Sequence, residues 1–192
     1  MLITLEYDRA RAVEYARRWA LSRNPLFLDF TGLGGNCTNF VSQCIFAGCG
    51  VMNYTETFGW YYISASRRAP AWTGVDEFHA FMTGDPEFVA ANGGTGPFAT
   101  ELRSDRTVEL GDVVQLANAS GNFYHTLIVT GYDSRGLLVS AHSDDALDRP
   151  LDSYPYYGLR FLQIGGAKVN VDGADFFRGL LDGTSLTPLL LT

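Results

Sequence analysis

One segment constrains the fold of this chain more than any other: "GGNCTNFVSQCIFAGCG", residues 34–50. Its apolar positions recur at helical spacing, with Phe40, Cys44 and Ala47 on one side and Val41 and Ile45 on the adjoining one. The pattern predicts a helix over residues 37–47 that Gly48 ends as a C-terminal cap. Because apolar or small residues occupy its flanks, we expect this helix to be buried at the centre of the domain.

The remaining pattern places helices before strands. An amphipathic helix is predicted over 7–22 and another over 73–84, where Thr73 and Asp76 fit a capping box. Four short β-rich runs, separated by turn residues, follow residue 100: 109–117, 124–132, 136–142 and 159–165. This order predicts an α+β fold, with the central helix packed on an antiparallel sheet. The length fits a single domain over 1–192, although residues 168–192 carry no pattern that assigns a structure.

Composition excludes several classes of function. Hydrophobic residues make up 46% of the chain and charged residues 18%, which is typical of a folded globular protein. A net charge of −7 argues against a general nucleic-acid or anionic-membrane partner, and no apolar run approaches the roughly 20 residues of a membrane span. The first residues carry charges where a secretory signal would have its apolar segment. Localisation stays open between the cytoplasm and a mature or excised domain of an exported protein.

The three cysteines form no recognisable framework. Cys37, Cys44 and Cys49 are an odd number within 13 residues, and their spacing lacks the paired geometry of structural zinc. We therefore expect neither a disulfide framework nor a metal, and no cofactor.

Cys37 stands where a thiol can react. A helix N-terminus favours the thiolate, and Gly34 and Gly35 allow another backbone to approach closely. The alternative is that Cys37 is one more small buried residue, which is common for free cysteines. Cys44 in the middle of the helix and Cys49 after it are interpreted as bystanders.

A nucleophilic cysteine needs a base, and the chain offers three histidines. His79 lies beside an apolar helical stripe and is interpreted as structural, whereas His125 begins a strand. A hairpin turn centred on residues 134–135 would place His125, His142 and Asp144 on one face of the sheet, so that either of the last two could orient His125. A shift of one residue in this register would put His142 on the other face.

An aromatic segment between the central helix and the third one could line a substrate site. It contains Tyr54, Phe58, Trp60, Tyr61, Tyr62 and Trp72. Core packing explains such residues equally well. On the helix side, the Cys37 N–H together with Asn36 or Asn39 could bind an oxyanion.

Seven ordered blocks resemble a known family: "YDRARAVEYARRWA", "GGNCTNFVSQCIFAG", "WYY", "AWTGVDEF", "LGDVVQLA", "HTLIVTGY" and "VSAHSDD..DRPL". They span about residues 5–165 and resemble the putative amidase domain family, of the papain-like NlpC/P60 and CHAP group of thiol hydrolases. The resemblance implies a papain-like fold in which Cys37 is the nucleophile, His125 the general base and His142 the orienting residue. Most relatives have aspartate before the cysteine, where this chain has Asn36.

The resemblance also implies a reaction and a substrate. We expect a cysteine amidase or peptidase that cleaves an amide bond, with a bacterial cell-wall (peptidoglycan) peptide as its partner, and acyl transfer by the same residues as a variant. Trp60 and Trp72 would then contact the substrate. Two other interpretations stay open: a catalytically silent papain-like module that binds cell-wall peptides, and a structural protein that associates through the apolar tail "GLLDGTSLTPLLLT".

Overall fold

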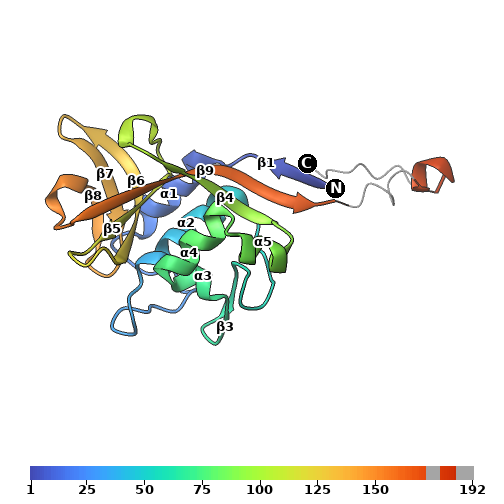
Figure 1. Ribbon diagram of the computed structural model, residues 1–192, viewed down its shortest axis with the longest axis horizontal. Coiled ribbons are helices and arrows are strands. Elements are labelled where there is room, and N and C mark those ends of the chain that lie inside the picture. Colours follow the sequence, from blue (N-terminus) through green and yellow to red (C-terminus); the bar gives the residue numbers. More distant parts are fainter. Residues whose placement is uncertain (172–177, 185–192) are drawn as a thin grey trace.

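The computed structural model describes residues 1–171 and 178–184, and its helices gather against one long sheet (Figure 1). The helices are α1 Arg9–Trp19, α2 Cys37–Cys49, α3 Pro70–Thr73, α4 Val75–Thr83 and α5 Pro86–Asn92. The strands are β1 Leu2–Leu5, β2 Tyr62–Ser64, β3 Arg67–Arg68, β4 Gly96–Leu102, β5 Val113–Ala117, β6 Phe123–Asp133, β7 Gly136–Ala141, β8 Ala146–Pro150 and β9 Gly158–Asn170. The predicted α+β class is confirmed.

Seven strands form one curled antiparallel sheet in the order β1-β9-β5-β6-β7-β8, and β4 adds to β9. The long strand β9 joins the two ends of the molecule, pairing with β5 near its start and with β4 and β1 further along. Strands β2 and β3 make a separate small hairpin, which projects beyond the helices in Figure 1.

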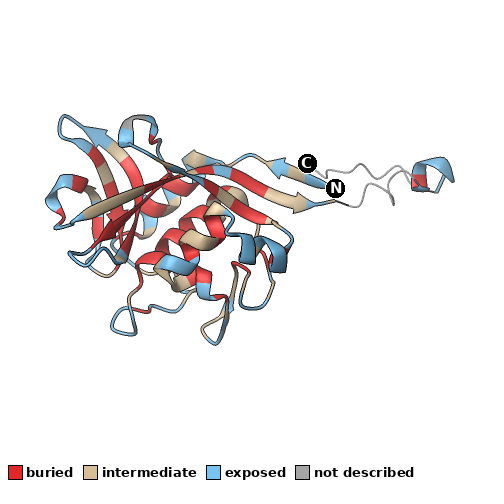
Figure 2. Cartoon of the chain, viewed as in Figure 1, coloured by how far each residue is buried: buried red, intermediate tan, exposed pale blue. Residues whose placement is uncertain are grey.

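The alternation of side chains along the strands creates two cores. On one face, Val113, Ile128 and Leu162 pack with the helices. On the other, Val114, Leu127 and Phe161 pack with residues of β7 and β8 inside the curl of the sheet. Figure 2 shows α2 as a nearly continuous buried element between α1, α4 and the sheet. The predicted central position of this helix is confirmed, since ten of its residues are buried.

Two of the predicted helix ends are wrong. Helix α2 continues past Gly48 to Cys49, and Gly50 is its C-cap, with a φ of 66° in the left-handed conformation. Gly48 is needed for another reason: a Cβ there would lie 2.3 Å from the Tyr7 ring, so only glycine lets the chain before α1 pack this closely. The capping box at Thr73 is also absent, because Gly74 breaks the segment into α3 and α4 and is itself the N-cap of α4.

The predicted hairpin is correct at its turn and wrong at its far end. Near the turn, Asp133 pairs with Gly136 and Gly131 with Leu138, as a two-residue loop requires. A β-bulge then shifts the register by one residue, so that Val129 pairs with Val139 and the register that would place His142 on the same face as His125 is lost. Strand β7 ends at Ala141, before His142.

The sequence pattern assigns no structure to the C-terminal segment 168–192. Its first residues, 168–170, complete β9, where they pair with β1. Residues 185–192, which include the end of the apolar tail, lie outside the described residues.

Candidate functional site

Cys37 and His125 line the same pocket, a cavity of about 270 Å³ at the N-terminus of α2. The remaining lining comes from the loop before α2, from the start of β6 and from the segment that follows β7: Gly34, Gly35, Tyr124, Ser143, Asp144, Arg149, Tyr154 and Pro155. Residues far apart in the sequence therefore meet around a thiol and an imidazole.

Cys37 is the first residue of α2 and is 7% exposed. Its Sγ lies 3.8 Å from the Thr38 hydroxyl. The first N–H groups of a helix have no partner within the helix, so the Cys37 N–H is available to a ligand. Gly34 and Gly35 precede it with φ values of 111° and 101°, conformations that favour glycine. In the described part of the chain the Cys37 sulfur has no hydrogen bond to the His125 ring.

The other two thiols are poor candidates for chemistry. Cys44 is fully buried, and this burial raises its pKa well above the ordinary value. Burial likewise raises the pKa of Cys49 to about 11. Neither residue lines the pocket that contains Cys37.

His125 is 7% exposed and sits near the start of β6, opposite Leu116 of β5. Burial lowers its pKa to about 4, while the nearby Asp144 carboxylate acts in the opposite direction. The imidazole is therefore neutral near pH 7. Its ring lies about 6 Å from those of Tyr124 and Tyr154, measured between centroids. Among residues 1–171 and 178–184, neither ring nitrogen of His125 has a hydrogen-bond partner.

His142 does not contact His125. Its Nδ1 accepts a hydrogen bond from the Asn36 amide at 2.9 Å, and its Nε2 donates to the Trp19 carbonyl at 2.9 Å. The ring stacks on Phe40 of α2, with 4.0 Å between centroids. Burial lowers the pKa of His142, and the two hydrogen bonds define a neutral ring protonated at Nε2. The predicted role as the direct orienter of His125 is therefore not supported by its contacts.

Asn36 links His142 to the start of the nucleophile helix. Its Oδ1 accepts hydrogen bonds from the Asn39 amide at 2.6 Å and from the Phe30 N–H at 3.2 Å. The Asn36 N–H donates to the Ser143 hydroxyl, which follows directly after His142. The side chain and the backbone N–H of the residue that precedes Cys37 are thus both held by hydrogen bonds.

Three residues predicted to contact the substrate are core residues instead. Asn39, Trp60 and Trp72 have no exposed surface. The Trp72 indole N–H donates to Asn39 Oδ1 at 2.9 Å, and the Trp60 indole N–H donates to the Ser42 hydroxyl at 3.1 Å. A substrate cannot reach any of the three. Asn36, 1% exposed, supports the site through its side-chain and backbone hydrogen bonds and not as an open oxyanion donor.

Sequence reasoning missed the opposite wall of the pocket. The Arg149 guanidinium lies 3.9 Å above the Tyr154 ring centroid and pairs with Asp144 at 3.2 Å. The Tyr154 hydroxyl is buried and has no hydrogen-bond partner in the described part of the chain. The available signal is the run of charged and aromatic residues over 144–157.

The turn after β7 is strained where it borders the pocket. Ser143 and Asp144 have φ values of 63° and 123°, which side-chain-bearing residues rarely adopt. Such strain is found preferentially at functional sites, where the surrounding structure holds it in place.

The described residues contain no group of three or more His, Cys, Asp or Glu side chains that could hold a metal ion. His79, interpreted as structural, bonds the Glu101 carboxylate at 2.7 Å, outside the pocket. Over the same described part of the chain, no helix is long and apolar enough to cross a bilayer.

A buried helix that carries a cysteine at its N-terminus, beside a strand that carries a histidine, defines a class of candidate hydrolases. The family described as "Putative amidase domain" matches residues 6–164, so the chain belongs to that family, whose description indicates amide hydrolysis. The chain is also 31% identical over 145 residues to the "Uncharacterized protein YhbB" of Bacillus subtilis (strain 168). That match covers 73% of this chain and 43% of the relative, so the chain spans less than half of the relative's length. No solved structure matches the chain.

Proposed function

We propose that the protein is a cysteine-dependent amidase in which Cys37 is the nucleophile and His125 the general base. One observation carries the proposal: a thiol at the N-terminus of a buried helix and a neutral imidazole line one pocket, and the imidazole nitrogens have no partner among the described residues. Pairing a nucleophile with a base in this way is how a weakly acidic thiol is activated.

The reaction would proceed through a thioester. The Cys37 thiol transfers its proton to His125 and its sulfur attacks the amide carbonyl, whose oxygen faces the unpaired Cys37 N–H. The C–N bond breaks as His125 returns the proton to the departing amine. Water then attacks the thioester, giving a carboxylic acid and the free thiol. An amine in place of water would give acyl transfer instead.

The substrate class is the finer part of the proposal. The motif resemblance to NlpC/P60 and CHAP thiol hydrolases supports a papain-like arrangement and a peptide of the bacterial cell wall. Arg149 on the far wall suits such a peptide, because its guanidinium can pair with a free carboxylate next to the scissile amide.

The test compares wild type with Cys37→Ala on defined cell-wall stem peptides, with products detected by mass spectrometry. We expect cleavage by wild type and by Cys49→Ala, a matched control outside the pocket, and at least a thousandfold loss in Cys37→Ala. Iodoacetamide labelling and peptide mapping should find Cys37 modified first. Full activity of Cys37→Ala would end the proposal, while cleavage of other amides alone would correct only the substrate.

A catalytically silent binding module is the second candidate, and the absence of a Cys37–His125 hydrogen bond in the described structure favours it. Catalytic hydrogen bonds are often long or poorly aligned before substrate binds, so the missing bond is compatible with catalysis as well. A silent module would retain peptides without forming product, and its Cys37 would label no faster than an ordinary cysteine.

A further inference from the structure

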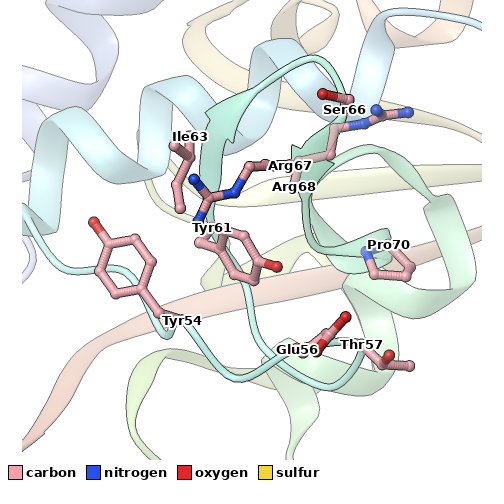
Figure 3. A pocket seen from close by; sticks show the side chains of 9 residues that line it. All are labelled: Tyr54, Glu56, Thr57, Tyr61, Ile63, Ser66, Arg67, Arg68 and Pro70. Atoms are coloured by element: carbon pink, nitrogen blue, oxygen red, sulfur yellow. The ribbon is translucent and has the colours of Figure 1, made fainter.

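A second pocket lies away from the Cys37–His125 cleft and shares no lining residue with it. Its cavity of about 560 Å³ is within the range of small-molecule sites. The loop before β2 and the β2–β3 hairpin form it, as Figure 3 shows: Tyr54, Glu56, Thr57, Tyr61, Ile63, Ser66, Arg67, Arg68 and Pro70.

The loop that carries Tyr54 and Glu56 is held rigidly. Asn53 and Trp60 exchange both backbone hydrogen bonds, at 3.0 and 2.8 Å, and so close the loop at its base. The buried Asn53 amide also donates to the Asn92 and Thr95 carbonyls, each at 3.1 Å. A rigid loop loses little entropy when a ligand binds, so this pocket is organised in advance.

Two tyrosines of the aromatic segment line the pocket, whereas the two tryptophans of the same segment are in the core. Tyr54 is 64% exposed, and its ring lies 5.6 Å from that of Tyr61 with an interplanar angle of 37°. Ile63, also exposed, stands beside them. Apolar ring surface left in water in this way marks a contact surface. Since the rings are tilted, they form a concave wall and not a parallel slot for a flat ligand.

The pocket also contains a free cation. Within the described residues the Arg67 guanidinium has neither an ion-pair nor a hydrogen-bond partner, and Figure 3 places it over the space between Tyr61 and Ile63. Arg68 is different, because it is engaged with Thr73 and lies 4.3 Å above the Phe30 ring. An unpaired arginine is notable in a chain of net charge −7. Glu56 and the Thr57 and Ser66 hydroxyls supply acceptors and donors on other walls.

We propose that this pocket binds an anionic sugar, a pyranose that carries a carboxylate or phosphate group. A sugar ring offers a C–H face for stacking on tyrosine and hydroxyls that require both donors and acceptors, and the pocket supplies all three. The acidic substituent pairs with Arg67, whose planar guanidinium suits carboxylate and phosphate alike. The site is independent of catalysis, because none of its residues belongs to the proposed thiol chemistry.

The test measures binding to the full-length Cys37→Ala protein, so that turnover plays no part. Calorimetric titrations use a uronic-acid oligosaccharide, a sugar phosphate, a neutral oligosaccharide of the same length, and inorganic phosphate. We expect saturable binding of at least one anionic sugar, weakening with salt, and weaker binding of the neutral sugar and of phosphate alone. Whichever of the uronic-acid oligosaccharide and the sugar phosphate binds more tightly identifies the acidic group as a carboxylate or a phosphate.

Substitutions of two exposed residues test whether the sugar binds in this pocket. Arg67→Gln should weaken the anionic sugar by about tenfold or more and leave the neutral sugar nearly unchanged. Tyr54→Ala should weaken both sugars by about threefold to tenfold. Tyr157→Ala is the matched control, because Tyr157 is 80% exposed and lines neither pocket. Absence of saturable sugar binding, or sugar binding that survives both substitutions, would overturn the proposal.

Discussion

The two walls of the Cys37–His125 pocket differ in how completely their polar groups are satisfied. Behind the helix wall, Asn36 and His142 do not line the pocket. They are buried and use their side-chain groups in hydrogen bonds to one another and to Phe30, Asn39 and Trp19. On the strand wall, the His125 ring nitrogens and the Tyr154 hydroxyl have no partner in the described part of the chain.

This difference distinguishes the residues that hold the structure in place from the residues that can act on a substrate. Buried polar groups are nearly always hydrogen-bonded, and a satisfied network fixes one conformation. The helix wall therefore holds the thiol in place, while the groups left unpaired on the strand wall remain available to a substrate. The predictions below test this division, from the largest expected effect to the smallest.

The largest effect is expected at the unpaired base. His125→Asn should lower kcat/KM by about a hundredfold to ten-thousandfold, because the general base is lost while the pocket keeps its shape. The kcat/KM of the wild type should be as high at pH 5 as at pH 7 and should fall only towards pH 4, since burial lowers the His125 pKa to about 4. An acid limb near pH 6.5 would show that this imidazole is hydrated in the working enzyme.

The lowered pKa of His125 should also make the free energy of unfolding depend on pH. Between about pH 6.5 and pH 4 the unfolded chain binds a proton at this histidine that the folded chain does not, so the free energy of unfolding falls as the pH is lowered. The loss below pH 4 is on the order of 3 kcal/mol. Urea denaturation of wild type and His125→Asn at pH 4 and 7 measures it, and the loss of stability should be smaller in the variant by this amount. The loss that remains includes the contribution of His142, whose pKa burial also lowers.

Behind the helix wall, His142→Ala should act mainly on structure. It leaves the Asn36 amide and the Trp19 carbonyl unpaired and removes the ring that stacks on Phe40, which costs about 2–4 kcal/mol of stability. We expect kcat to fall while Cys37 labelling stays measurable. His142→Gln, whose amide can accept from Asn36 and donate to Trp19, should restore part of both. A loss of activity without loss of stability would instead indicate direct action on His125.

How far the sequence predicts this site depends on the range of the interactions involved. The helix start at Cys37, the turn between Asp133 and Gly136 and the separation of helices from strands follow from local patterns, and all three are correct. The bulge after Val129 has no local signal, yet a shift of one residue moves His142 to another surface. The aromatic segment is similar, because composition alone cannot distinguish the buried Trp60 from the exposed Tyr54.

Replacing the residue before the nucleophile tests the protonation of the helix wall. The Asn36 amide donates to His142 Nδ1, which keeps that ring neutral. Asn36→Asp removes the donor and leaves a buried carboxylate that needs one, so His142 should become protonated at Nδ1 and its pKa should rise above the ordinary 6.5. Titration of the histidine ring protons by NMR measures this change. An unshifted His142 would mean that the carboxylate is neutralised by another group.

The smallest effect is expected at Asp144, the other candidate for orienting His125. Its side chain is largely exposed and pairs with Arg149 at 3.2 Å, and exposed pairs contribute about 0–1 kcal/mol. Asp144→Asn suits the test better than alanine, because asparagine tolerates positive φ more readily than alanine does and Asp144 has a φ of 123°. Its negative charge opposes the burial that lowers the His125 pKa, so its removal should move the acid limb slightly further down. At neutral pH, where the imidazole is already unprotonated, kcat/KM should change by less than about threefold. If Asp144→Asn lowers kcat/KM more than His142→Ala does, the Asp144 carboxylate orients His125. The strand wall would then contain both the general base and the residue that positions it.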